Sequence, residues 1–209
     1  NTLMQAIYPK GSRNPHGPIV GGCGFDLTPT NTVITPNNIV VFQYQVYFPP
    51  DFDFARGGKL PGIYGGGISC TGGTPALNCF SVRIMWRRNG FGEAYVYLPR
   101  SAQVPGFCTT PPVTVCNPIY GASIGRGSFQ FLRNQWNTIR IMLKVNSSPG
   151  AQDGWLQVDW NEQHTVNMDN LAWRIMDNVT TSGVEFSTFY GGSSPPFDAP
   201  ATTFTLFKS

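Results

Sequence analysis

The side chains that could do chemistry in this chain are cationic and phenolic. Lys59 lies in a glycine-rich stretch, Ser81 and Arg83 lie two positions apart, and Tyr95 and Tyr97 repeat that spacing. Side chains two apart on a β-strand point to the same face of the sheet. A lysine and an arginine can neutralise a carboxylate and so acidify the neighbouring C–H, while a tyrosine held near its phenolate form by cations can take that proton and protonate a leaving oxygen. These residue types permit β-elimination at a uronic acid.

Whether the arginine and the tyrosines meet depends on the turn that follows the arginine strand. A two-residue turn at Asn89-Gly90 would send the tyrosines to the face opposite Arg83. A three-residue loop over 89–91, with the glycine left-handed, pairs Arg83 with Tyr97 and keeps both on one face. We predict the three-residue loop.

Other catalytic chemistries find less support in the sequence. A glycosidase needs two carboxyl groups on either side of the scissile bond, and the acids form no cluster at alternating positions; Asp51 and Asp53 follow a Pro-Pro pair and indicate a turn. His16 and His164 lack the spacing of metal ligands, and there is no GxSxG nucleophile motif. We expect neither a metal nor a cofactor.

The elements that must position these residues are β-strands. The chain has 24 Gly, 18 Pro and 13% aromatic residues, without apolar positions at helical spacing, which predicts an all-β single domain over residues 1–209. Residues 1–37 should wrap the body with a few short strands, and 57–67 should form a long turn that presents Lys59. The expected strands are 40–48, a hairpin of 80–88 with 93–98, a hairpin of 136–145 with 154–160, and then 184–190 and 202–207. Two facing antiparallel sheets follow, and a curved sheet would offer a concave polar face.

The strand over 40–48 alternates most clearly between apolar and polar residues. Its core face holds Val40, Phe42, Tyr44, Val46 and Phe48. Its other face carries the set Gln43, Gln45 and Tyr47, which we predict as sugar-binding positions.

The cysteines indicate an extracellular protein. Cys70 with Cys79 and Cys108 with Cys116 are closely spaced pairs among turn residues, which predicts two loop-closing disulfides and leaves Cys23 as a buried or inert thiol. The sequons at Asn146 and Asn178 agree with secretion.

The charge pattern limits the possible partners. The chain begins at Asn1 without an apolar leader, from which we expect that a signal peptide has been removed. With a net charge of +3 and 12% charged residues there is no basic stripe for nucleic acid, and no 18-residue apolar run predicts a membrane span. We expect a secreted monomer that binds an acidic polysaccharide.

Three blocks together resemble polysaccharide lyase family 14: Gly57–Gly62, then Ser81-Val82-Arg83, then Tyr95-Val96-Tyr97. The resemblance continues through the strands at 136–145 and 154–160 to Phe189–Gly192, and so covers about residues 38–207. It implies a concanavalin-like jelly-roll sandwich with a concave cleft and metal-independent β-elimination of a β-1,4-linked uronan such as glucuronan or alginate, which leaves a 4,5-unsaturated uronate end.

Position by position, the resemblance assigns a catalytic set of Lys59, Ser81, Arg83, Tyr95 and Tyr97. Ser81 would orient, Arg83 and Lys59 would neutralise the carboxylate or stabilise the enolate, and the tyrosines would handle protons; base and acid stay unassigned. The two cysteine loops depart from the family pattern and leave the substrate open.

Two other kinds of protein could use such a sandwich. A jelly-roll carbohydrate-binding module or lectin would present the same aromatic residues and glycine-rich loops without catalysis. An adhesion domain with a laminin-G-like sandwich would leave the candidate residues scattered.

Overall fold

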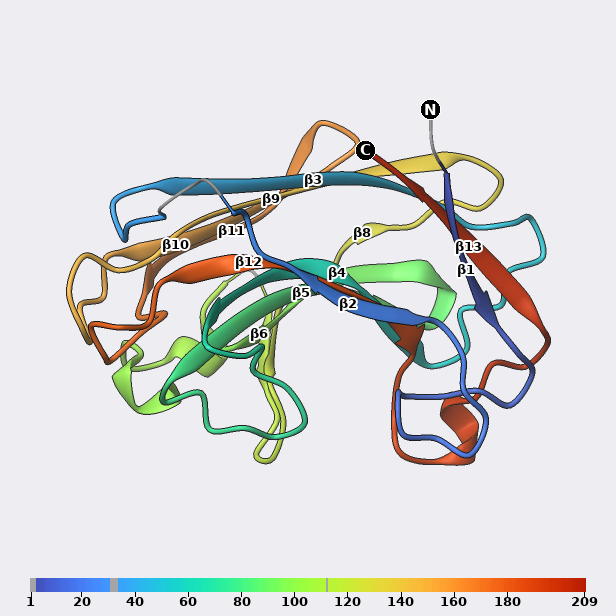
Figure 1. The fold of residues 1–209 in the computed structure, drawn as a ribbon, viewed down its shortest axis with the longest axis horizontal. Helices are drawn as coiled ribbons and strands as arrows, with labels where there is room; N and C mark the ends of the chain where they lie inside the picture. The colour runs from blue at the N-terminus through green and yellow to red at the C-terminus, as the bar shows by residue number, and fades with distance from the viewer. Residues whose placement is uncertain (1–2, 31–33, 112) are drawn as a thin grey trace.

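The computed structural model describes residues 3–30, 34–111 and 113–209, and in these residues two antiparallel sheets pack face to face (Figure 1). The six-stranded sheet runs in the order β1 (Met4–Tyr8), β13 (Thr203–Lys208), β3 (Ile39–Tyr47), β9 (Trp136–Lys144), β10 (Gly154–Trp160) and β11 (Gln163–Leu171). The seven-stranded sheet runs β2 (Cys23–Leu27), β12 (Thr181–Tyr190), β4 (Gly57–Gly66), β5 (Cys79–Arg87), β6 (Phe91–Tyr97), β8 (Ala122–Gln130) and β7 (Thr114–Cys116). The predicted all-β jelly-roll sandwich of two antiparallel sheets is confirmed.

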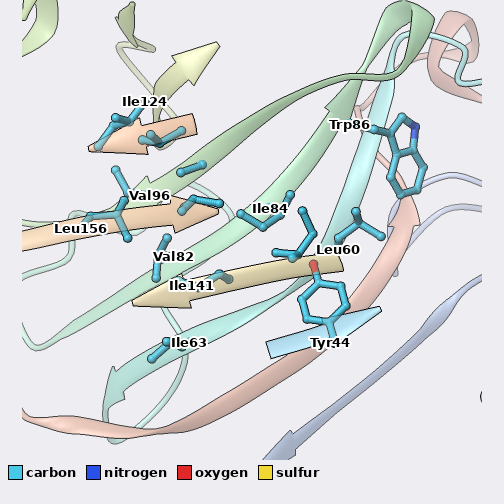
Figure 2. Close-up of a cluster of buried hydrophobic side chains, with 14 of the residues drawn as sticks. Tyr44, Leu60, Ile63, Val82, Ile84, Trp86, Val96, Ile124, Ile141 and Leu156 are labelled. Carbon is cyan, nitrogen blue, oxygen red and sulfur yellow. The ribbon is translucent and has the colours of Figure 1, made fainter. Parts of the chain in front are cut away.

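The core lies between the sheets, where side chains from both inner faces interdigitate (Figure 2). On β5, Phe80, Val82, Ile84 and Trp86 are each 0% exposed. Because side chains alternate along a strand, the positions between them point to the outer face of the seven-stranded sheet. The burial of each large apolar side chain stabilises the sandwich by about 1.5–3 kcal/mol, and it orients the polar face opposite.

The predicted core face of the strand over 40–48 is found on β3. Tyr44, Val46 and Phe48 are at most 4% exposed, whereas Val40 and Phe42 are partly buried. The second predicted hairpin is also present, because residues 139–144 of β9 pair with residues 155–160 of β10. The N-terminal segment supplies β1 and β2, which pair with β13 and β12, while residues 1–2 and 31–33 of that segment lie outside the described part.

The stretch predicted as a long turn over 57–67 is instead a strand, β4, in the middle of the seven-stranded sheet. Its glycines permit close packing: a Cβ at Gly58 would lie 1.9 Å from the Trp86 ring, and a Cβ at Gly62 would lie 1.9 Å from the Val82 carbonyl oxygen. Pro61, which has no N–H for a ladder, falls at a register shift between β4 and β5. Lys59 is therefore held on a rigid strand.

The hairpin between β5 and β6 has the predicted loop length but a different register. The loop is 88–90, and it pairs Arg83 with Tyr95 and Ser81 with Tyr97. Asn89 and Gly90 take left-handed φ values of 62° and 82°. Phe91 pairs with Gln130 of β8 and so belongs to the strand. The loop thus begins one residue earlier than predicted, and the partner of Arg83 is two residues earlier on β6 than predicted. Because side chains two apart share a face, the arginine and the tyrosines are still on one face.

Both predicted disulfides are present, Cys70–Cys79 and Cys108–Cys116. Cys23 is free and partly buried, and it packs against the core cluster. Among the described residues, no helix has the length and apolar character needed to cross a membrane.

Candidate active site

The outer face of β4, β5 and β6 brings the five predicted catalytic residues together. Lys59 lies opposite Met85, Arg83 opposite Tyr95 and Ser81 opposite Tyr97 in the strand registers. The sheet is curved, and loops extend beyond it on both sides in the lower part of Figure 1. One polar face of this sheet therefore carries an amine, a guanidinium and two phenols.

Lys59 is a buried amine on this face of the sheet. Its side chain is buried, with Nζ 3.2 Å from the centroid of the Tyr95 ring and 2.7 Å from Sδ of Met85. Burial lowers the pKa of Lys59 well below its usual value, and the guanidiniums of Arg83 and Arg87 lower it further. The ring face favours the ammonium form by about 1–2 kcal/mol, which does not offset the burial of a charge. The lowered pKa makes this lysine release its proton more readily than an exposed lysine does.

Arg83 forms an ion pair within the protein, with Glu185. It is 2% exposed, and its Nη1 donates to Oε1 of Glu185 over 2.9 Å while Nη2 donates to Oγ1 of Thr71 over 3.1 Å. Among the described residues, its buried Nε has no hydrogen-bond partner. Sequence reasoning missed Glu185. It lies on the predicted strand over 184–190, but its partner Arg83 is 102 positions away. The ion pair orients the guanidinium on this face of the sheet.

The tyrosines stand edge to face, with ring centroids 5.8 Å apart. The Tyr95 hydroxyl accepts a hydrogen bond from Gly121 N over 3.0 Å, and the Tyr97 hydroxyl accepts one from Gly73 N over 3.1 Å. Each phenol keeps its own proton to donate. Burial raises the pKa of Tyr95, and the neighbouring Tyr97 raises it further. Arg87 lowers this pKa, as expected of a cation, but burial outweighs that effect, so Tyr95 is not held near its phenolate form.

The loop closed by the first disulfide is fastened directly to this face. Ser81 is fully buried and donates from Oγ to the carbonyl oxygen of Cys70 over 2.7 Å. Three neighbours of Cys70 also bond to this face. Ser69 donates to Glu185, Thr71 accepts from Arg83, and Gly73 N donates to Tyr97. Ser81 thus orients the loop that surrounds the site.

A second buried carboxylate lies on β6, on the same face of the sheet as the tyrosines. Glu93 is 0% exposed and accepts hydrogen bonds from Arg87 over 2.5 Å, Arg126 over 3.0 Å and Ser123 over 2.9 Å. Its position two residues before Tyr95 was the signal that sequence reasoning overlooked. Within the described ranges, no three His, Cys, Asp or Glu side chains group as metal ligands do.

The predicted sugar-binding residues are not brought to this face. Gln43, Gln45 and Tyr47 are on β3, in the other sheet, and their side chains alternate with core residues, so they point outward. Gln45 donates to Thr138 and Tyr47 donates to Asn134, each over 2.9 Å. The whole core separates them from Lys59 and Arg83.

The two predicted glycosylation sites differ in accessibility. Asn146 is 0% exposed, and its amide nitrogen donates to the carbonyl oxygens of Ser148 and Arg174. Its Oδ1 accepts from the backbone N–H groups of Trp173 and Arg174. Asn178 is exposed. In the folded chain only Asn178 of these two presents its amide to solvent.

Comparison with known proteins assigns the chain to a class. The family model described as polysaccharide lyase 14 matches residues 1–209. The chain therefore belongs to polysaccharide lyase family 14, as the three sequence blocks predicted.

Individual relatives are similar in sequence and in structure. The crystal structure of the marine alginate lyase of this family from Aplysia kurodai is 33% identical with a TM-score of 0.88, covering 99% of this chain and 80% of that one. The alginate lyase vAL-1 from Chlorella virus is 28% identical with a TM-score of 0.82, covering 99% of this chain and 82% of that one. A curated relative, exolysin of Paramecium bursaria Chlorella virus 1, is 26% identical over 188 residues, which are 81% of this chain and 28% of the exolysin. The chain thus spans less than a third of that relative.

Proposed function

We propose that this chain cleaves alginate, a β-1,4-linked uronan, by β-elimination. The observation that carries the proposal is the meeting of a buried lysine of lowered pKa, an arginine and a proton-bearing tyrosine on one face of a family 14 sandwich. Alginate is favoured over glucuronan because the similar solved proteins from Aplysia kurodai and Chlorella virus are alginate lyases.

The reaction starts at the uronate carboxylate. The guanidinium charge of Arg83, on the same face of the sheet, attracts it and withdraws electron density, which acidifies the proton on C5 and stabilises the enolate that forms. The neutral amine of Lys59 takes the C5 proton. No metal is required in this scheme, because the guanidinium supplies the positive charge.

The leaving oxygen receives its proton from Tyr97. The electrons of the broken C5–H bond form the C4=C5 double bond, the C4–O4 bond breaks, and the Tyr97 hydroxyl protonates O4. This hydroxyl accepts a bond from Gly73 N, which also stabilises the phenolate left behind. The products are a 4,5-unsaturated uronate and a shortened chain, and proton exchange with water restores Lys59 and Tyr97.

The remaining residues position these three. Tyr95 places its ring against the Lys59 amine, and burial keeps it protonated. Glu185 holds Arg83, so the substrate carboxylate must share the guanidinium with it.

We also propose that the protein acts outside the cell as a monomer. Its two disulfides persist in oxidising compartments. The exposed Asn178 is the sequon that could carry a glycan there.

The test is the ultraviolet absorbance of the unsaturated uronate at about 235 nm. Purified protein is incubated with alginate, glucuronan and pectate in turn. We expect a rise with alginate that exceeds the rise with glucuronan and is absent with pectate. No rise with any of them would contradict the proposal and favour the carbohydrate-binding module.

A further inference from the structure

A cavity of about 320 Å³ lies beside the candidate site, on the side of β6 that faces β8. It is lined by the first disulfide loop around Thr74, by Arg100 and Ser101 after β6, and by Tyr120 before β8. Tyr97 lines it as well, so the cavity and the site share a residue. A sugar ring in the cavity would be adjacent to one at Tyr97.

The lining of this cavity suits an acidic sugar. Arg100 is the one charged residue among those that line it, and hydroxyl groups come from Thr74, Ser101 and Tyr120. A second cavity of about 480 Å³ has mixed charge, because Asp53 and Asp198 line it with Arg56 and Arg88. A carboxylate therefore meets an uncompensated cation in the first cavity only.

The walls of the cavity are fixed to the catalytic tyrosines. Gly73 N donates to the Tyr97 hydroxyl over 3.1 Å, and Gly121 N donates to the Tyr95 hydroxyl over 3.0 Å. Arg100 donates from Nη2 to the carbonyl oxygen of Tyr120. One disulfide closes the loop that contains Gly73, and the other closes the loop at 108–116. Arg100 is thus held in place and keeps further N–H donors for a ligand.

We propose that this cavity is a subsite that binds the uronate next to the one undergoing elimination. The guanidinium of Arg100 pairs with its carboxylate, the geometry for which arginine is best suited. Tyr120, 45% exposed, packs its ring against the sugar. The inference rests on the proposed function, since it assigns the next residue of the same acidic chain.

The experiment compares Arg100→Ala with the unaltered protein on purified oligo-alginates of two to six residues. Because the subsite binds a residue away from the bond that breaks, KM should rise about tenfold for oligomers long enough to occupy it. The kcat should stay within about twofold, and the shortest cleaved oligomer should show no change. The matched control is Arg88→Ala, which removes an exposed arginine from the second cavity.

Two results would overturn the inference. One is an Arg100→Ala enzyme that behaves like Arg88→Ala at every length, and the other is a KM that rises equally at all lengths. Calorimetric titration of the alginate hexamer into the Lys59→Met protein, with and without Arg100→Ala, measures the affinity that Arg100 contributes when no cleavage takes place. If the unaltered protein cleaves no uronan, the proposed function fails; the titration still decides the subsite, because unchanged affinity refutes it.

Discussion

Replacement of Lys59 by methionine tests both the chemistry and the electrostatics of the site. Methionine keeps a buried unbranched side chain and removes the amine that lies 3.2 Å from the Tyr95 ring centroid. A positioned general base contributes about 10²–10⁴ in rate. We therefore expect kcat on alginate to fall by at least about 100-fold, measured by the absorbance of the unsaturated product.

The pH dependence gives the same prediction a second readout. Elimination needs the neutral amine, so kcat/KM should rise with pH through the lowered pKa of Lys59. The folded protein binds a proton on this lysine less readily than the unfolded chain, whose lysines have a pKa of about 10.4. Stability should thus increase with pH between the lowered pKa and the unfolded value, and Lys59→Met should remove that increase. Each pKa unit of the difference is worth about 1.4 kcal/mol, so the variant should be more stable than the parent at neutral pH.

The matched control is Lys208→Met. Lys208 also places its Nζ over an aromatic ring, 4.3 Å from the centroid of Trp136, but it is on the other sheet. Its activity should stay within about twofold of the parent. If Lys59→Met retains activity within tenfold, or if its urea midpoint keeps the parent's pH dependence, the assignment of Lys59 as a buried neutral base is wrong.

Three further substitutions test neighbouring parts of the site. Tyr97→Phe should lower kcat by about 100-fold or more while the circular dichroism spectrum stays native, because it removes the proton for O4 and one hydrogen bond from Gly73 N but keeps the buried ring; an active variant would exclude Tyr97 as the acid. Glu185→Ala leaves Arg83 as an unpaired buried cation, so urea titration should show a loss of about 3–5 kcal/mol, and a loss under 1 kcal/mol would contradict the pairing. Replacing Cys70 and Cys79 by serine opens a loop of sequence separation 9 and should lower the free energy of unfolding by about 2.5 kcal/mol. It should also lower kcat, because the loop holds Gly73 against Tyr97; an unchanged kcat would show that the loop does not position the tyrosine.

Spacing along single strands was the reliable signal in this sequence. The alternation over 80–87 buried Phe80 and Val82 and placed Ser81 and Arg83 on the outer face. Close cysteine pairs predicted both disulfides in the same way, because the loops they close are short. Local periodicity is enough where the answer depends only on neighbours in sequence.

The glycine-rich stretch was misread because glycine serves two purposes. It permits left-handed turns, and it also permits close approach of another group. Gly58 faces the Trp86 ring and Gly62 faces the Val82 backbone, contacts that no local pattern contains. The sequon at Asn146 gave no sign that this side chain is buried. Its partners, Trp173 and Arg174, are distant in sequence, so no local pattern reveals them.

The sequence by itself determined the β class and the alternating core, because these follow from residue type and period, and its resemblance to family 14 predicted the set of lysine, arginine and tyrosines. Only the tertiary structure decided the hairpin register, through the pairing of Phe91 with β8. It also decided the pairing of Arg83 with Glu185, 102 positions away. The burial that lowers the pKa of Lys59 likewise comes from neighbours on other strands. Charge, hydrogen bonding and desolvation act through space, so the reactivity of the site is a property of the folded sheet.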